Sequence, residues 1–317
     1  MEAPIGCRRA LMSTHPREVA KGFFEARLRA FFELAEREPA LTEVLYDGGP
    51  VVVDIGGELR SHDPCGLDDD TVLAAALNAT AYNDTVFSEK RPFVSVLMPP
   101  DWRVSFWRPP VVQRPTMALR KLRRLAIPLE RYVATSIMTE HQAEQLRQLV
   151  LARKTVIVSG SVGSGKTTLL RTLLGLIPRD ERIITIEDPR ELMLISEDGL
   201  TPRDHWVPLE AIAGVMAMDA CLRSALRGRP DRIIVGEVRG PEALELVRAL
   251  NTGHGGSLFT LHSNGAREAL DRLHTLVLEA QPSFRFETVE RSIDAVVQID
   301  GRGDRRRVTE IWENNDG

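Results

Sequence analysis

Residues 156–168, Val-Ile-Val-Ser-Gly-Ser-Val-Gly-Ser-Gly-Lys-Thr-Thr, have the types and the spacing of a phosphate-binding loop. Four residues separate Gly160 from Gly165-Lys166-Thr167, as that motif requires. The apolar run before the loop predicts a buried strand, and leucines at helical spacing after it predict a helix whose positive N-terminus faces the anion. With both elements in place, we prefer a nucleoside triphosphate site to a glycine-rich turn that binds nothing.

The residues of this loop each suit a phosphate. Glycines at 160, 163 and 165 let backbone N–H groups converge on phosphate oxygens, where a Cβ would clash. Lys166 brings a point charge to the β- and γ-phosphates, and the Thr167 hydroxyl is placed to bind Mg²⁺. The residues expected to contact the nucleotide are Gly160, Ser161, Val162, Gly163, Ser164, Gly165, Lys166, Thr167 and Thr168.

Hydrolysis of ATP also needs a group that positions and polarises water. Residues 233–237, Ile-Ile-Val-Gly-Glu, predict an apolar strand that ends in a carboxylate. Because ligands of parallel sheets bind at that end of the strands, we predict Glu237 to be the base. Two alternatives stay open, a surface glutamate at the end of a strand and a simple ion pair with Arg239.

A second strand also ends in acids, Glu187 and Asp188 after residues 183–186. Adjacent like charges repel unless a cation lies between them, and Mg²⁺ with its water shell would be that cation. The metal ligands expected from this pattern are Thr167, Glu187 and Asp188, with Glu187 also a candidate catalytic group. The alternative is a turn or helix-cap acid before Pro189.

His254 and His262 flank a short predicted strand, residues 257–261. They lie eight residues apart with no other Cys or His nearby, which makes a poor metal site. An imidazole at the carboxyl end of the strand could instead contact the γ-phosphate. His262 is at that end and His254 is at the other, so His262 is the candidate.

Composition favours a soluble globular protein. The chain has 317 residues, which predicts about two domains, with 43% hydrophobic and 27% charged residues. A net charge of −4 speaks against a nucleic-acid partner. Three cysteines without a C-x-x-C pair argue against a four-thiolate zinc site and fit a reducing compartment. No membrane-spanning run or signal peptide is evident, so we expect a cytoplasmic protein.

The first part of the chain predicts an α+β domain over residues 1–112. An amphipathic helix over 16–38 has an aromatic stripe, for which core packing and docking on a membrane or partner both stay open. The next predicted elements are strands at 41–46 and 51–55, a helix at 69–82 capped by Asp68 or Asp69, and strands at 93–98 and 103–107. Prolines and a basic cluster predict a linker at 113–130. That cluster suits a solvated face, or contact with phosphate, acidic lipid or a neighbouring subunit.

From residue 131 to 317 strands and helices alternate, which predicts an α/β domain with a mostly parallel sheet covered on both faces. Residues 295–300 and 306–312 predict a closing hairpin. Residues 195–210 have no clear period and are predicted to be a loop.

Four motifs occur in order, at residues 160–168, 185–189, 226–240 and 252–262. They resemble the Walker A, Asp, Walker B and His boxes of the type II/IV secretion-system ATPase superfamily. Within it, the chain is most similar to the conjugal-transfer (TrbB-like) ATPases of type IV secretion. N-terminal landmarks of that branch are matched by Leu41–Leu45, Asp47-Gly48, Pro109–Val112 and Leu119–Lys121. The resemblance covers roughly residues 40–282.

The resemblance implies a hexameric ring whose protomers join an N-terminal α+β domain to a RecA-like P-loop ATPase domain, with ATP between the two. It also implies arginines from the N-terminal side that complete the site, where an arginine acting in trans would stabilise charge on the transferring phosphoryl group. Our candidates are Arg103 and Arg120, with Arg108, Arg227 and Arg229 as further options. Each could equally be a surface or salt-bridge residue.

The expected function is therefore an ATP-hydrolysing motor of a type IV secretion or conjugal-transfer machine, at the cytoplasmic face of the inner membrane. Its expected partners are further copies of itself and other proteins of that machine. A type IV pilus or type II secretion assembly ATPase is the alternative, although the four-cysteine element frequent there is absent. A nucleotide-gated structural ring and a DNA-handling ATPase are rivals of other classes. Val162, Gly255 and Tyr46 depart from common family residues without touching a catalytic role.

Overall fold

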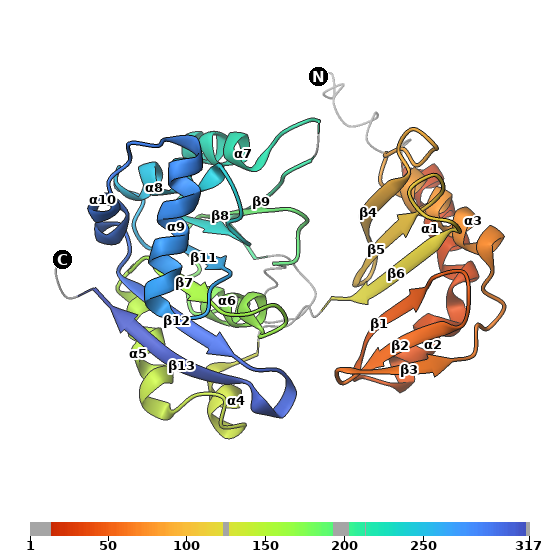
Figure 1. Cartoon of the computed structure of the whole chain (residues 1–317), viewed down its shortest axis with the longest axis horizontal. Helices are drawn as coiled ribbons and strands as arrows, with labels where there is room; N and C mark the ends of the chain where they lie inside the picture. Colours follow the sequence, from red (N-terminus) through yellow and green to blue (C-terminus); the bar gives the residue numbers. More distant parts are fainter. Residues whose placement is uncertain (1–13, 123–126, 193–202, 213, 315–317) are drawn as a thin grey trace, which may run out of the picture. The chain divides into compact units, whose positions relative to one another are not determined.

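The computed structural model describes residues 14–122, 127–192, 203–212 and 214–314. The chain forms two compact units, residues 1–123 and 124–317 (Figure 1). No helix in the described ranges is both long and apolar enough to cross a membrane. Cys7 and the arginines at 123 and 124 lie outside these ranges.

The first unit is a six-stranded antiparallel sheet with helices packed on one face (Figure 1). The strands lie in the order β3-β2-β1-β6-β5-β4. They are β1 (Leu41–Tyr46), β2 (Val51–Ile55), β3 (Glu58–His62), β4 (Phe93–Met98), β5 (Trp102–Trp107) and β6 (Thr116–Lys121). The helices are α1 (Thr14–Arg27), α2 (Arg29–Arg37) and α3 (Asp69–Tyr82).

Side chains alternate along these strands between the face that the helices cover and the other face. β5 illustrates this, because Trp102, Val104 and Phe106 are buried whereas the residues between them are half-buried. The buried set packs with Phe24 and Phe31 of the first two helices. The other face is therefore left to polar and half-buried side chains.

Most elements predicted for this unit are confirmed. The β1–β2 hairpin and the β4–β5 pair are present, and Asp68 caps α3 by accepting a 2.8 Å hydrogen bond from the Thr71 N–H. A single helix over 16–38 is wrong, because α1 and α2 are separated at Leu28. Phe24 and Phe31 of the aromatic stripe are buried, as core packing predicts, whereas Phe23 is 54% exposed. β3 was not predicted, because its mainly exposed side chains show no apolar alternation.

The linker predicted at 113–130 is wrong over residues 116–121, which form β6. This strand pairs with both β1 and β5, so it lies inside the sheet rather than between domains. Met117 and Leu119 are buried at alternating positions, whereas Arg120 is exposed. The first unit therefore extends beyond residue 112, and the next described helix begins at Leu129.

The second unit is built on a seven-stranded sheet in the order β13-β12-β7-β11-β10-β8-β9 (Figure 1). All neighbouring pairs are parallel except β12–β13, so the predicted mostly parallel sheet and the closing hairpin are confirmed. The strands are β7 (Val156–Ser159), β8 (Ile183–Glu187), β9 (Trp206–Glu210), β10 (Arg232–Val235), β11 (Leu258–Leu261), β12 (Ala295–Asp300) and β13 (Arg307–Glu313).

Two hydrophobic cores cover the two faces of this sheet. Every residue of β7, β10 and β11 is buried, as expected for central strands covered on both sides. One core packs α7 (Met218–Ala225), α8 (Glu242–Leu250), α9 (Ala266–Ala280) and α10 (Phe286–Arg291) on one face. The other packs α4 (Leu129–Ala134), α5 (Glu140–Leu151) and α6 (Lys166–Leu174) on the opposite face.

One strand of this sheet contradicts the prediction of a loop over residues 195–210. Residues 206–210 form β9, which pairs with β8 at the edge of the sheet. All five of its residues are half-buried, so the strand lacks the alternation that reveals an edge strand in a sequence. Residues 193–202 lie outside the described residues.

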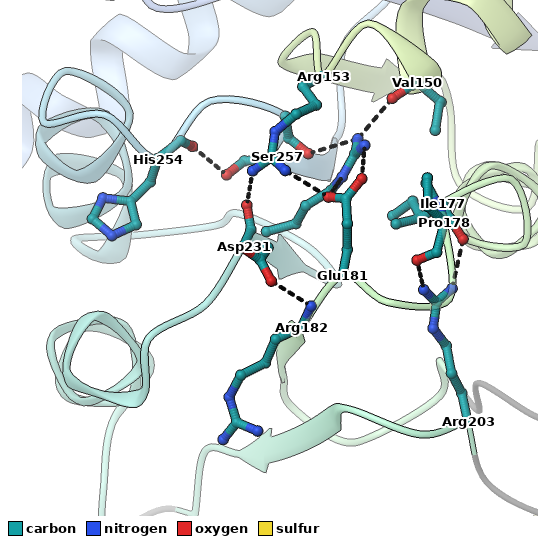
Figure 2. Close-up of polar contacts among 12 residues, drawn as sticks. Val150, Arg153, Ile177, Pro178, Glu181, Arg182, Arg203, Asp231, His254 and Ser257 are labelled. Carbon is teal, nitrogen blue, oxygen red and sulfur yellow. Dashed lines mark hydrogen bonds and ion pairs between the residues drawn. The ribbon is translucent and has the colours of Figure 1, made fainter.

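The amino-terminal edge of this sheet holds a buried ionic network (Figure 2). Arg232, at the start of β10, is fully buried. Its Nε and Nη2 lie 2.7 and 2.9 Å from the two carboxylate oxygens of Glu181, and its Nη1 donates to the Val150 carbonyl at 2.8 Å. Arg153 adds a second guanidinium 3.0 Å from Glu181. His254 lies at this edge, where its carbonyl accepts a hydrogen bond from Ser257.

Candidate ATP site

The parallel strands all point their carboxyl ends to the opposite edge, where the candidate site lies. β7 leads into the glycine-rich loop, and α6 begins at Lys166 directly after it, so the strand and the helix predicted around the loop are both present. Gly160 has a φ of 154°, and a Cβ there would lie 2.0 Å from the Ile299 carbonyl oxygen. Only glycine fits the point where the chain leaves the sheet.

Lys166 is buried at the start of α6, with 6% of its surface exposed. Its ammonium group donates to the carbonyls of Gly160 at 2.9 Å and Ser161 at 2.8 Å, and lies 3.0 Å from His262 Nδ1. Burial lowers the pKa of Lys166 from 10.5 to about 8, against the opposing charges of Glu237 and Asp300. The lysine is therefore a cation held in a poorly solvated place, where a phosphate would stabilise it.

His262 joins this lysine to the carboxylate predicted to be the base. Its Nε2 lies 3.0 Å from Glu237 Oε1, and its Nδ1 faces the Lys166 ammonium. An ammonium group can only donate, so Nδ1 accepts and Nε2 carries the hydrogen that Glu237 accepts. These contacts assign the neutral Nε2–H tautomer and link Lys166, His262 and Glu237 in one chain of hydrogen bonds.

Glu237 follows β10 and is 22% exposed. Arg239 Nη2 donates to its Oε2 at 2.6 Å, so the ion pair anticipated from the sequence is present alongside the contact with His262. Burial tends to raise the pKa of Glu237, but the hydrogen bond and charge of Arg239, together with the charge of Lys166, lower it below its ordinary value. Glu237 is thus a carboxylate that stays ionised and can accept a hydrogen bond from water.

Glu187, one of the expected metal ligands, is the last residue of β8 and is buried. It is only 2% exposed, and its Oε2 accepts hydrogen bonds of 2.7 Å from the N–H groups of Glu191 and Leu192. Its Oε1 is buried and has no hydrogen-bond partner among the residues that the structure describes. Burial raises the pKa of Glu187 to about 7. A Cβ at Gly236 would lie 2.9 Å from the Glu187 Cγ, so the glycine before Glu237 leaves room for this side chain.

Comparison with known proteins identifies the family of this site. A match to the family described as Type II/IV secretion system protein covers residues 95–300. Conjugal transfer protein TrbB of Rhizobium radiobacter is 37% identical over 227 residues, which are 70% of this chain and 68% of TrbB. The chain belongs to the type II/IV secretion system protein family.

Further comparisons agree with this secretion family. Type IV secretion system protein PtlH of Bordetella pertussis is 34% identical over 273 residues, 76% of this chain and 80% of PtlH. The X-ray structure of the Legionella pneumophila ATPase DotB has a TM-score of 0.64 at 19% identity and covers 87% of this chain and 77% of DotB, which supports the fold. The secretion ATPase of the TrbB-like conjugal-transfer type, predicted from four ordered motifs, is thereby confirmed.

Oxygen donors in this secretion ATPase fit Mg²⁺, which takes few protein ligands and keeps water and phosphate oxygens. Thr167 is half-buried at the second position of α6, and Asp188 is exposed directly after β8. Within the described ranges no group of three or more His, Cys, Asp and Glu side chains could hold a metal alone. The unpartnered Oε1 of Glu187 is a further oxygen at this edge. The metal roles of Thr167, Glu187 and Asp188 remain predictions.

The two preferred arginines belong to the first unit of the secretion ATPase. Arg103 and Arg120 are register partners on β5 and β6, so the structure brings them side by side. Arg103 Nε donates to Ser95 at 3.2 Å, and Arg120 Nε donates to Glu43 at 2.6 Å. The salt-bridge alternative is thus present for Arg120, and a role for either arginine at the nucleotide remains a prediction.

The remaining arginine options have other surroundings. Arg108 lies over the Phe87 ring, 5.7 Å from its centroid. Arg227 belongs to a short 3-10 helix, Leu226–Gly228, and Arg229 follows that helix with a φ of 52°. None of these contacts favours one of the three over Arg103 and Arg120.

Two arginines that the sequence reading missed contact the phosphate loop of the secretion ATPase. Arg302 Nε and Nη2 donate to the Val162 carbonyl at 3.2 and 3.0 Å, and Arg306 Nη2 donates to the Gly163 carbonyl at 3.4 Å. Both lie in the β12–β13 hairpin, where residues 302–307, Arg-Gly-Asp-Arg-Arg-Arg, have the composition of an ordinary turn. Only the pairing of β12 with β7 reveals their position.

Proposed function

We propose that this secretion ATPase hydrolyses MgATP at the carboxyl edge of its seven-stranded sheet, and that hydrolysis drives a conjugal-transfer or related type IV secretion machine. The observation that supports the site most strongly is the hydrogen-bonded chain of Lys166, His262 and Glu237. It places a cation, a neutral imidazole and an ionised carboxylate beside the glycine-rich loop. These are the groups that phosphoryl transfer to water needs.

Each of these residues has a distinct role in the proposal. Lys166 and the loop N–H groups bind the phosphates, and Glu237 orients and polarises the attacking water. His262 keeps Glu237 in position through its Nε2–H, and its Nδ1 accepts a hydrogen bond from Lys166, which binds the phosphates. Mg²⁺, when bound, would neutralise charge on the phosphates, with Thr167, Glu187 and Asp188 as its protein ligands. Glu187 fixes the turn after β8 through the N–H groups of Glu191 and Leu192.

We also propose that the working form is a homohexameric ring in which Arg103 and Arg120 act on ATP bound to a neighbouring protomer. Arg103 and Arg120 are register partners on β5 and β6, so both guanidinium groups lie on the same face of the sheet, where Glu43 pairs with Arg120. An arginine that reaches the transferring phosphoryl group stabilises its charge. Such a composite site would couple turnover to assembly of the ring and to motion between its parts.

The names of the relatives support the proposal that the motor serves a conjugal-transfer or related type IV secretion machine. TrbB is named a conjugal transfer protein and PtlH a type IV secretion system protein. These names favour the conjugal-transfer machine over a pilus or type II secretion apparatus. We place the protein in the cytoplasm, at the inner face of the inner membrane, with the other proteins of that machine as its partners.

The test of this proposal is ATP turnover per protomer over a wide range of protein concentration, with the mass of the assembly measured alongside. We expect turnover to rise as a ring forms, because each site needs residues from two protomers. Flat turnover from a monomer would remove the ring and the composite site. ATP binding without turnover at any concentration would favour a nucleotide-gated structural ring.

Mixing two inactive variants sharpens that test. Arg103→Ala protomers keep the loop, and Lys166→Ala protomers keep the arginine, so mixed rings should recover part of the turnover if Arg103 acts across the boundary. Arg60→Ala, an exposed arginine of the same sheet paired with Glu58, is the matched control and should keep full turnover alone. No recovery at any mixing ratio would contradict the role of Arg103.

A further inference from the structure

We propose that Arg302 and Arg306 are positioning residues of the phosphate loop, and that their guanidinium groups fix the orientation of its peptide planes for ATP. This inference rests on the proposed ATP site. Within the sheet, β7 lies between β11 and β12. The loop after β7 is therefore flanked by His262, which follows β11, and by the hairpin that follows β12. The catalytic groups lie on the first side, and these two arginines lie on the second.

The contacts bear on the direction of the loop N–H groups. In a trans peptide the carbonyl of one residue and the N–H of the next point in opposite directions. Arg302 holds the Val162 carbonyl with two donors, at 3.2 and 3.0 Å, and so turns the Gly163 N–H away from the hairpin. Arg306 holds the Gly163 carbonyl, and the Ser164 N–H of the same peptide plane points across the loop to the Ser161 carbonyl at 3.3 Å. The contacts with Arg302 and Arg306 therefore set the direction of the Gly163 and Ser164 N–H groups.

Two glycines of the motif make this packing possible. A Cβ at Gly163 would lie 3.2 Å from Arg302 Nε, and a Cβ at Gly165 would lie 3.1 Å from Arg306 Nε. Side chains at these positions would press on the guanidinium groups. Gly163 and Gly165 therefore leave room for the two arginines on the outer side of the loop, in addition to their role on the side that faces the phosphates.

The two arginines are not equal. Among the described residues, Arg302 makes two contacts with one carbonyl, whereas Arg306 makes one longer contact and its buried Nε has no hydrogen-bond partner. We therefore expect Arg302 to contribute more to the orientation of the loop. Both charges also raise the positive potential beside the phosphates, so the experiment must separate orientation from charge.

The experiment measures ATP affinity, KM and kcat for the full-length wild type and for variants of the hairpin. In Arg302→Ala/Arg306→Ala we expect the Kd and the KM for ATP to rise about tenfold, because charge-assisted hydrogen bonds that orient the loop are lost. The kcat at saturating ATP should stay within about twofold of wild type. Arg302→Lys should recover part of the affinity. Arg305→Ala removes the same charge from the same hairpin, and among the described contacts its side chain has none with the loop. It should bind ATP like the wild type.

Hydrogen–deuterium exchange of residues 160–166, measured without nucleotide, gives a readout independent of activity. We expect faster exchange in the double variant and unchanged exchange in Arg305→Ala. Wild-type ATP affinity and wild-type exchange in a folded double variant would overturn the inference. An equal loss of ATP affinity in Arg305→Ala would also overturn it, because it would show that positive charge alone matters. A fall in kcat at unchanged KM would also overturn it. A wild type that binds no ATP, with Lys166→Ala indistinguishable from it, would contradict the proposed ATP site itself.

Discussion

The two edges of the seven-stranded sheet both bury charged groups but treat them differently. At the amino-terminal edge Arg232 meets both carboxylate oxygens of Glu181 and a backbone carbonyl (Figure 2). The hydrogen bond from Arg232 holds the pKa of Glu181 below its ordinary value. At the carboxyl edge burial lowers the pKa of Lys166 to about 8 and raises that of Glu187 to about 7.

The directions of these pKa shifts distinguish the amino-terminal edge of the sheet from its carboxyl edge. A paired charge at the amino edge is stabilised in its ionised form, whereas burial pushes Lys166 and Glu187 at the carboxyl edge toward neutrality. The unpartnered Glu187 Oε1 and the desolvated Lys166 are costly in the protein alone and would gain from a cation and an anion, respectively. This pattern supports the proposal that ATP binds at the carboxyl edge.

The largest expected effect on stability lies at the amino edge. Arg232→Met removes the fully buried guanidinium and leaves Glu181, 12% exposed, with Arg153 as its one remaining ionic partner among the described residues. We expect the free energy of unfolding to fall by about 3–5 kcal/mol, measured by urea denaturation, because breaking a buried pair leaves an uncompensated charge. The folded variant should still bind ATP.

The double variant Arg232→Met/Glu181→Gln is the control for this prediction, because it removes both charges. It should regain part of the lost stability. A loss below about 1 kcal/mol in the single variant, the range of an exposed pair, would contradict a stabilising network at this edge.

A smaller effect of opposite sign is expected at the carboxyl edge. The pKa of Glu187 is raised from 4.5 to about 7, so its contribution to stability is complete below pH 4.5 and is lost as the pH rises through 7. Glu187→Gln keeps an oxygen for the N–H groups of Glu191 and Leu192 and removes the buried charge. At pH 8 we expect it to be more stable than wild type by up to about 3 kcal/mol. Urea denaturation at pH 5 and pH 8 should show the difference shrinking at the lower pH.

Asp188→Asn removes the exposed neighbouring charge and is the matched control, with an expected change within about 0.5 kcal/mol. If Glu187→Gln also loses turnover, the buried Glu187 carboxylate lowers stability but is needed for activity. Unchanged or lower stability at pH 8 would mean that the buried carboxylate is satisfied and that the two edges do not differ as described.

The parts that sequence reasoning predicted are local in the chain. The spacing from Gly160 to Lys166 and the apolar strand before Glu237 lie within short windows, so the loop, its helix and the strand-end acids were found. β6 had the alternation of a half-buried strand in Met117 and Leu119, but the basic residues around it favoured a linker. β9 has no alternation at all.

The missed features depend on contacts between distant segments. Arg302 reaches Val162 across 140 residues, because β12 pairs with β7. The inward direction of Glu187 depends on which side of β8 faces the core, and the buried run before it does not specify that. The hydrogen bond from Lys166 to His262 likewise needs β7 and β11 to be neighbours.

The central claim is tested most directly by measuring MgATP binding and turnover on the same preparations of wild type, Glu237→Gln and Lys166→Ala. The account predicts that Glu237→Gln binds ATP with a Kd within a few-fold of wild type and that its turnover falls by about 10²–10⁴-fold. Lys166→Ala should lose binding and turnover together. Turnover at the wild-type rate in Glu237→Gln would contradict the account and move the base elsewhere at this edge, with Glu187 the next candidate.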